Sequence, residues 1–223
     1  MLPDIALIRS CLESIRTKPF QMACKAAYLF SGRISEVVSQ SYGNEKVYGP
    51  SGSDVFQDFF VTGDKRFDVV VFKVKTAKRN GLQRNIGLPL DFEPWAKQLF
   101  SYFQEFGKDF VFPFMRQDVW REAKQAFKGL WYPIEKYVVW KDGKLEKVVE
   151  DHERSYTLHA LRHSRTTELV EFYGFEALNL AAYCGWTITT AGSQFGVNVP
   201  KVISRYLYLN WQGYFPKLLK PRI

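Results

Sequence analysis

Three segments rich in β-branched and aromatic residues follow one another in the middle of the chain. They cover 55–61, 67–75 and 82–90, and the stretches TGDKR and TAKRNG separate them. Short connections of turn-forming residues between such segments indicate antiparallel hairpins. The sequence therefore predicts a small three-stranded antiparallel sheet with a basic hairpin tip.

Apolar residues at helical spacing dominate on both sides of this sheet. The predicted helices lie within 4–30 (two helices, the second at about 20–30), at 33–42, and at about 92–106, 117–129 and 157–173. Gly32 can end the second helix and Gly174 the last of these. An Asp-Gly pair inside YVVWKDGKLEKVV predicts a further hairpin.

The fold class expected from these elements is α+β, mainly α-helical with a small three-stranded antiparallel sheet. No internal repeat or linker divides the chain, so 1–223 is predicted to be a single domain. After residue 175 the tail is expected to be mostly helical, with a loop near 190–200.

Composition places the chain among soluble globular proteins, with 46% hydrophobic and 24% charged residues. It contains no run of about 18 apolar residues, so no membrane span is expected. The N-terminus carries Asp4 and Glu13 and lacks the apolar core of a signal peptide. Three cysteines without CxxC spacing favour a reducing, cytoplasmic setting with neither a disulfide framework nor a zinc site.

The charge balance indicates a polyanionic partner. Lysine and arginine total 31 against 23 acidic residues, which gives a net charge of +8. A basic surface of this size is compatible with nucleic acid. It is equally compatible with a basic protein that binds no polyanion.

Two of the three histidines lie on one predicted helix, within YTLHALRHSRTTELVEFYG. His159, Arg162 and His163 are three to four residues apart and can share one helix face. A metal site would place the permanent cation of Arg162 beside a divalent ion, so no metal is predicted. Standing alone, the motif would also suit polar residues that satisfy a buried helix end.

Other motifs accompany it, and together they resemble the catalytic domain of the tyrosine recombinase (phage integrase) family. The family pattern runs from an arginine in G-x-R-[IV]-S-E through a hairpin lysine, H-x-x-R on a helix and a histidine or tryptophan. It ends at a tyrosine in R-Y-x-x-L. The stretches SGRISE, VKTAKR, HALRH, YCGWT and RYLYL follow this order across 31–209. The matching residues are Arg33, Lys75, His159, Arg162, Trp186 and Tyr206.

The chain departs from the family pattern in three respects. Gly32 directly precedes Arg33, whereas the family has one residue between them. Counting back from the tyrosine at family spacing reaches Val197, whereas counting forward from Arg162 reaches Trp186, which can donate a hydrogen bond. We therefore assign Trp186 and interpret 188–199 as an insertion. The sequence shows no counterpart of the family's N-terminal DNA-clamping domain, so we expect either a catalytic fragment or a single-domain member of the family.

The resemblance implies phosphoryl transfer on double-stranded DNA. The hydroxyl of Tyr206 would attack a backbone phosphate, giving a 3′-phosphotyrosyl link and a free 5′-hydroxyl. The guanidiniums of Arg33 and Arg162 would bind the oxygens on which negative charge accumulates. No metal or other cofactor is required, because the arginines take the role of a divalent ion, and no ATP is required, because the covalent link conserves the bond energy.

The remaining roles concern protons and hydrogen bonds. Lys75 would protonate the leaving 5′ oxygen, and His159 would shuttle the proton of the tyrosine. Trp186 would donate its indole N–H to phosphate, although it could equally fill the core. Lys73 and Lys78 compete with Lys75 for its role, and Tyr208 and Tyr214 compete less well with Tyr206. The predicted DNA-binding residues are Lys73, Lys78, Arg79, His163 and Arg205.

Three functions fit this pattern: a site-specific recombinase or integrase, a DNA-binding relic of an integrase that no longer cleaves, and a relaxing enzyme similar to type IB topoisomerases. For the first we expect a monomer in the free state and a homotetramer on DNA. The apolar tail, 207–223, is expected either to pack on its own domain or to pass to a neighbour.

Overall fold

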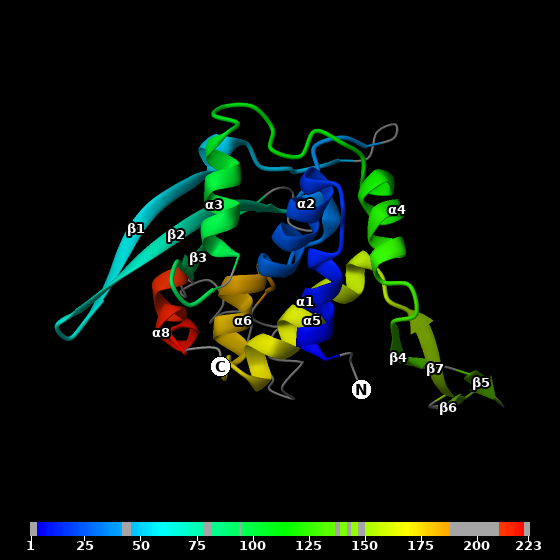
Figure 1. Cartoon of the computed structure of the whole chain (residues 1–223). Helices are drawn as coiled ribbons and strands as arrows, with labels where there is room; N and C mark the ends of the chain where they lie inside the picture. Colours follow the sequence, from blue (N-terminus) through cyan, green and yellow to red (C-terminus); the bar gives the residue numbers. More distant parts are fainter. Residues whose placement is uncertain are drawn as a thin grey trace.

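The computed structural model describes residues 4–41, 46–77, 82–93, 95–136, 139–141, 144–146, 150–187 and 210–220. Within 132–154 it describes the backbone alone. These parts form an α+β fold, as predicted (Figure 1). The α-helices are α1 (Ile5–Glu13), α2 (Lys18–Leu29), α3 (Ala96–Gln104), α4 (Arg116–Ala126), α5 (Leu158–Glu171), α6 (Ala177–Cys184) and α8 (Phe215–Leu218). Short 3₁₀ turns are η1 (Ile34–Glu36), η2 (Gly52–Asp54) and η5 (Trp211–Gly213).

The predicted three-stranded sheet is confirmed. Its strands are β1 (Val55–Thr62), β2 (Lys65–Thr76) and β3 (Leu82–Pro89), in the order β1-β2-β3 and antiparallel throughout. Thr62 pairs with Lys65 and Thr76 with Leu82, so each connection joins neighbouring strands directly. Their richness in β-branched and aromatic residues located these strands, because such side chains pack well on a pleated surface, and the central part of β2 is buried on both faces.

Helices α2 and α3 cover one face of the sheet. The ring of Phe72 lies 5.0 Å from that of Phe30 and 5.1 Å from that of Phe103, measured between centroids. Edge-to-face and tilted aromatic contacts of this kind add to the free energy of burial. The core continues from this face as one cluster from Ile8 to Leu218.

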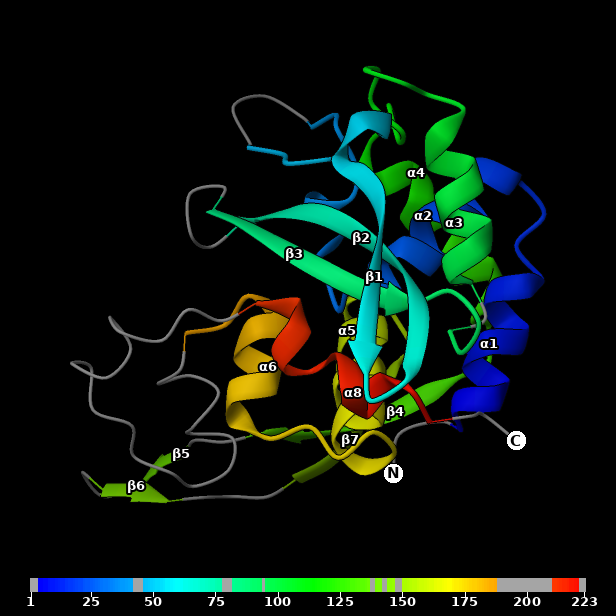
Figure 2. The same cartoon turned by 90° about the vertical axis from the view of Figure 1, so that its left-hand side faces the viewer.

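The C-terminal segment covers the other face of the sheet, below β3 in Figure 2. The Tyr214 hydroxyl contacts the backbone N–H of Gly87 at 3.1 Å, and the Phe215 ring lies 5.0 Å from that of Phe60. A Cβ on Gly87 would come within 2.5 Å of the Trp211 ring. Residues 210–220 therefore pack on their own chain, and whether the tail passes to a neighbouring copy stays a prediction.

The end of α2 differs from the prediction that Gly32 stops it. Ser31 adopts the left-handed conformation, with φ +43°. Its N–H bonds to Tyr28 O at 2.9 Å, and the Gly32 N–H bonds to Ala27 O at 3.0 Å. This is a Schellman cap, in which serine occupies the position that glycine usually takes. The departure matters because Arg33 follows the cap directly.

The helix predicted at 33–42 is wrong. Only the single turn η1 forms, and the chain then runs extended, with the Ser39 N–H bonded to Phe112 O at 3.1 Å. Glu36 at the end of that turn is buried, and so are Val37 and Val38. Three consecutive buried residues do not suit one face of a surface helix. The demands of the core therefore override the local pattern.

Two further strand pairs lie between α4 and α5. The Asp-Gly hairpin is confirmed, with β5 (Val139–Lys141) paired to β6 (Lys144–Glu146). In the sequence this hairpin lies between two further paired strands that the sequence did not predict, β4 (Trp131–Lys136) and β7 (Glu150–Ser155). Helix α5 follows as predicted, and Gly174 takes φ +68° after its end. Within the parts of the chain just described, no helix combines the length and apolar character needed to cross a membrane.

Candidate active site

Glu36 is the centre of the candidate site. Its side chain is completely buried at the end of η1. The carboxylate accepts hydrogen bonds from the backbone N–H of Arg33 (3.2 Å), the Arg33 guanidinium (3.2 Å) and the backbone N–H of Ala77 at the end of β2 (3.1 Å). A buried carboxylate requires such partners to offset its desolvation. Glu36 therefore joins the turn after α2 to the β2–β3 hairpin.

Arg162 reaches the same carboxylate from α5. Its Nη1 lies 4.0 Å from Glu36 Oε2, and its Nη2 donates to Cys184 O at 3.5 Å. The guanidinium carbon lies 5.6 Å from the centroid of the Trp186 ring, which is a cation–π distance. Three residues assigned from the sequence, Arg33, Arg162 and Trp186, are thereby brought to one place.

Arg162 keeps its positive charge at neutral pH. Burial, as the largest cause, lowers its pKa to about 10, and the repulsion from Arg84 adds to this. Electrostatic interactions with Cys184 and Glu36 act in the opposite direction. The side chain is only 5% exposed, and its Nη1 makes no hydrogen bond within the described part of the chain. Arg162 therefore has an unused donor next to Glu36.

Arg84 is a third arginine at this carboxylate, and the sequence analysis did not assign it to the site. Its Nη2 donates to Glu36 at 3.3 Å and to Phe30 O at 3.0 Å, and its Nη1 donates to Tyr183 O. These partners hold the ends of α2 and α6 against β3. Arg84 pairs with buried Val74 across the sheet, so strand alternation could have identified it as inward-facing.

The serine at the α2 cap ties the same three elements together. Ser31 Oγ lies 3.0 Å from Thr166 Oγ1, 3.4 Å from Arg162 O and 3.4 Å from Cys184 Sγ. Its left-handed backbone costs about 1 kcal/mol, which these contacts offset. The cap thus fixes the chain immediately before Arg33 against the helix that carries Arg162.

The two histidines of α5 lie beside each other at the surface. The ring centroids of His159 and His163 are 4.8 Å apart, with their planes nearly perpendicular. Partial burial, followed by repulsion from Arg162, lowers the pKa of His163. Helix α5 therefore places His159, Arg162 and His163 on adjoining turns, as the i, i+3, i+4 spacing predicted.

A separate ion network lies about one turn further along α5 from Arg162. Arg165 is completely buried and contacts Glu93 at 2.8 Å and Glu168 at 2.6 Å. Its guanidinium carbon lies 5.5–5.6 Å from the ring centroids of Tyr28, Tyr173 and Tyr183. Enclosed in this way, Arg165 stabilises the packing of α2 against α5 and is inaccessible to a ligand.

The hairpin lysines lie on the other face of the sheet from Arg84. Lys75 pairs with Gln83 and is exposed, whereas the neighbouring pair Val74 and Arg84 points inward. Lys73 shares the face of Lys75, with its ammonium 5.4 Å from the centroid of the Phe56 ring. The strand pleat therefore separates Lys75 from the arginines, although both lie near the same end of the sheet.

Four assigned residues, Lys78, Arg79, Arg205 and Tyr206, lie outside the described residues. So does Tyr208, whereas Tyr214 is described and completely buried. Burial, with a contribution from Tyr183, raises the pKa of Tyr214 well above its ordinary value. A phenol without access to solvent cannot attack DNA, so Tyr214 has a packing role.

No group of three histidine, cysteine, aspartate or glutamate side chains that could hold a metal occurs among the described residues.

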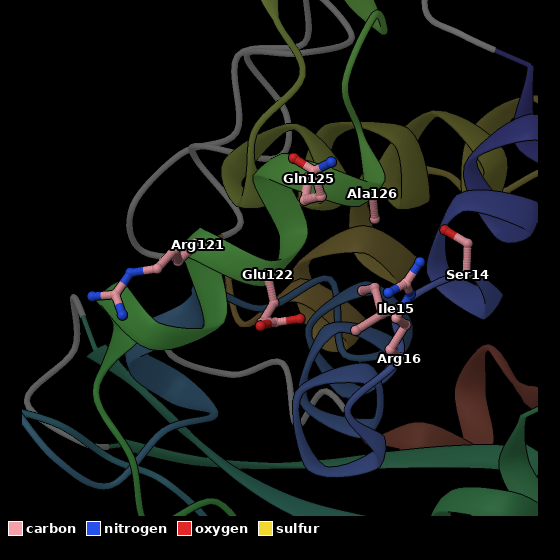
Figure 3. A pocket seen from close by; sticks show the side chains of 7 residues that line it. All are labelled: Ser14, Ile15, Arg16, Arg121, Glu122, Gln125 and Ala126. Atoms are coloured by element: carbon pink, nitrogen blue, oxygen red, sulfur yellow. The ribbon is translucent and has the colours of Figure 1, made fainter.

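A cavity of about 510 Å³ lies between the end of α1 and α4, lined by Ser14, Ile15, Arg16, Arg121, Glu122, Gln125 and Ala126. In Figure 3 the Arg121 side chain points away from Ile15 and Arg16. The two arginines that line this cavity therefore do not converge on one ligand position.

The chain matches no known protein-family model, no curated protein and no solved structure. The class that the structure defines is therefore an α+β protein with a buried carboxylate between three arginines. A more specific assignment is a proposal that rests on the residues of this chain.

Proposed function

We propose that this chain cleaves and rejoins double-stranded DNA through a 3′-phosphotyrosyl intermediate, in the manner of a tyrosine recombinase. The observation that carries the proposal is the meeting of Arg33 and Arg162 at the buried Glu36, 3.2 and 4.0 Å from its carboxylate. These arginines come from distant parts of the sequence, and the family pattern that the sequence resembles assigns each of them to phosphate.

The arginine pair suits a phosphate that gains negative charge during attack. Arg33 is 25% exposed and held in place through its own backbone and side chain by Glu36. The Nη1 of Arg162 is buried beside the same carboxylate and has no hydrogen-bond partner among the described residues. Two guanidiniums that are already oriented stabilise developing oxyanions without reorganising during the reaction. The Trp186 indole, beside Arg162, would add a third donor.

The covalent step follows from a phenol as nucleophile. The Tyr206 oxygen forms a bond to phosphorus, and the bond from phosphorus to the 5′ oxygen breaks. The phenol proton passes to His159, and a hairpin lysine, assigned as Lys75, delivers a proton to the leaving 5′ oxygen. The reverse reaction by another 5′-hydroxyl rejoins the strand, so the sum of bonds and protons is unchanged.

One observation favours a second candidate function, a DNA-binding relic. Arg162 is only 5% exposed and Arg84 only 6%, and both contact Glu36. An arginine cluster with this little exposure could serve as a structural ion network alone. A relic would bind DNA and never form a covalent adduct. A topoisomerase-like enzyme would form the adduct and relax supercoiled plasmid without exchanging strands.

A suicide substrate tests the proposal directly. The protein is mixed with nicked duplex DNA from its own genomic neighbourhood, in excess EDTA, because the mechanism assigns phosphate neutralisation to the arginines. We expect a covalent adduct on a denaturing gel. Tyr206→Phe should abolish it while leaving DNA affinity within about twofold, because only one hydroxyl is lost.

The neighbouring tyrosine provides the matched control. Tyr208→Phe should form adducts at the wild-type level. Adducts that survive in Tyr206→Phe and vanish in Tyr208→Phe would transfer the nucleophile to Tyr208. Absence of adducts in the wild-type protein, together with retained DNA binding, would select the relic.

A further inference from the structure

An open pocket of about 320 Å³ adjoins the candidate site, between α4 and the start of α5. Its lining residues are Ile34, Arg116, Gln117, Trp120, Thr157, Leu158 and His159. His159 belongs both to this pocket and to the candidate site, and Ile34 directly follows Arg33. A group attached to a phosphate at Arg33 and His159 would therefore have this pocket next to it.

The pocket presents an aromatic ring together with apolar surface. The indole of Trp120 is 45% exposed, which is unusual for so large an apolar side chain. Ile34 and Leu158 supply aliphatic surface nearby. A flat heteroaromatic ring can stack on such an indole, whatever its pattern of polar groups. The volume also lies at the lower end of the range for small-ligand sites.

Polar groups at the pocket fit a nucleobase that remains attached to its phosphate. The Gln117 amide offers a donor and an acceptor, the pair that base edges require. The Lys124 ammonium lies 5.0 Å from the centroid of the Trp120 ring and brings positive charge to the rim. The net charge of +8 has the same sign, so the surroundings attract a polyanion.

We infer that this pocket holds one unstacked nucleobase of the DNA, next to the phosphate at Arg33 and Arg162, with Trp120 as its stacking partner. The inference rests on the proposed function and adds a specificity-determining residue to it. Removing a base from the duplex costs a few kcal/mol, and least where the base is already unpaired. The protein therefore favours DNA with an unpaired base beside the cleavage position.

The test compares two nicked duplexes that differ only in whether the base beside the nick is paired. Binding is measured by fluorescence anisotropy in the Tyr206→Phe background, so that no cleavage interferes. We expect tighter binding of the unpaired duplex. Trp120→Ala should abolish this preference and weaken binding of the unpaired duplex by about fivefold to a hundredfold, the value of one stacked base.

Matched variants separate stacking from folding. Trp120→Phe keeps an aromatic ring and should retain most of the preference, whereas Trp120→Leu keeps only apolar volume and should lose it. Trp131→Ala removes an equally exposed tryptophan, 51% exposed and outside the pocket, and should change nothing. Circular dichroism of each variant verifies the fold.

The inference and the proposed function can fail separately. If Trp120→Ala prefers the unpaired duplex as strongly as the wild type does, the proposed role of the pocket is wrong. The same holds if the wild-type protein does not bind DNA. If the wild-type protein forms covalent adducts and substitution of Trp120 does not change the preference for the unpaired duplex, the proposed function holds and the role of the pocket is wrong. A preference that depends on Trp120, in a protein that forms no adduct, would support the pocket and remove the cleavage activity.

Discussion

At the scale of single residues, Glu36 decides how the arginines are arranged. Its buried carboxylate contacts Arg33, Arg84 and Arg162 within 4.0 Å. The latter two are almost completely buried, so their desolvation is offset chiefly by this one anion and by backbone carbonyls. A change at Glu36 should therefore affect the stability of the protein as well as the site.

We predict that Glu36→Gln lowers the free energy of unfolding by about 3–5 kcal/mol, the range for removing one partner of a buried ion pair. Urea denaturation measures it. The control is Glu105→Gln, which removes an exposed pair with Lys18 at 3.8 Å and should change the value by less than about 1 kcal/mol. Equal effects of the two substitutions would show that Glu36 is not the centre of the cluster.

Lys75 lies on the face of the sheet opposite Arg84, so its proposed role as general acid needs a direct test. We predict that Lys75→Ala slows cleavage by about 10²–10⁴-fold, the usual contribution of a general acid. A substrate with sulfur in place of the 5′ bridging oxygen should restore the rate, since a thiolate leaves without a proton. Single-turnover cleavage of both substrates measures the effect.

The competing lysines supply the controls for that prediction. Lys73→Ala should cleave both substrates at similar rates, because its ammonium is engaged with Phe56. If the sulfur-containing substrate restores the cleavage rate of Lys78→Ala and not that of Lys75→Ala, the proton donor is Lys78.

At the scale of elements, the C-terminal segment η5–α8 is part of the core. Tyr214, Phe215 and Leu218 are at most 1% exposed. Burial of three such side chains contributes about 5 kcal/mol or more. A tail that passed to a neighbouring copy would have to reproduce these contacts there.

We therefore predict that Phe215→Ala lowers the free energy of unfolding by about 3–5 kcal/mol, as for other buried phenylalanines. Thermal or urea unfolding of the DNA-free protein measures it, and the exposed neighbour Gln212→Ala should have an effect below about 0.5 kcal/mol. A small effect of Phe215→Ala would mean that the segment is not docked in solution.

At the scale of the whole molecule, the proposed function gives the net charge of +8 a role in the encounter with DNA. We predict that DNA affinity depends steeply on salt, because phosphate contacts release counterions. With about six such contacts, the affinity would fall about 10³-fold between 50 and 200 mM salt. A titration of one duplex at four salt concentrations checks it, and a fall of less than tenfold would indicate another mode of recognition.

Strand exchange sets a further requirement at this scale. Two duplexes need four active sites, so we propose that the free monomer assembles into a homotetramer on DNA. Sedimentation with and without a pair of duplexes distinguishes this arrangement from a single-site binder.

Local pattern alone determined several features of this protein. The β-branched and aromatic residues of 55–90, with the turn-forming stretches between them, specified the three strands, and the Asp-Gly pair specified the β5–β6 hairpin. The spacing of His159, Arg162 and His163 placed them on adjoining turns of α5. These predictions held because each depends on residues that are close in sequence.

Tertiary structure alone decided the rest. The predicted helix at 33–42 is replaced by the single turn η1, because Glu36 turns inward to arginines from β3 and α5, which no local pattern reveals. Ser31 takes the left-handed cap because its hydroxyl meets Thr166 and Cys184. The tail folds back because Gly87 leaves room for Trp211. In each case the free energy comes from partners far along the chain, which only the folded molecule brings together.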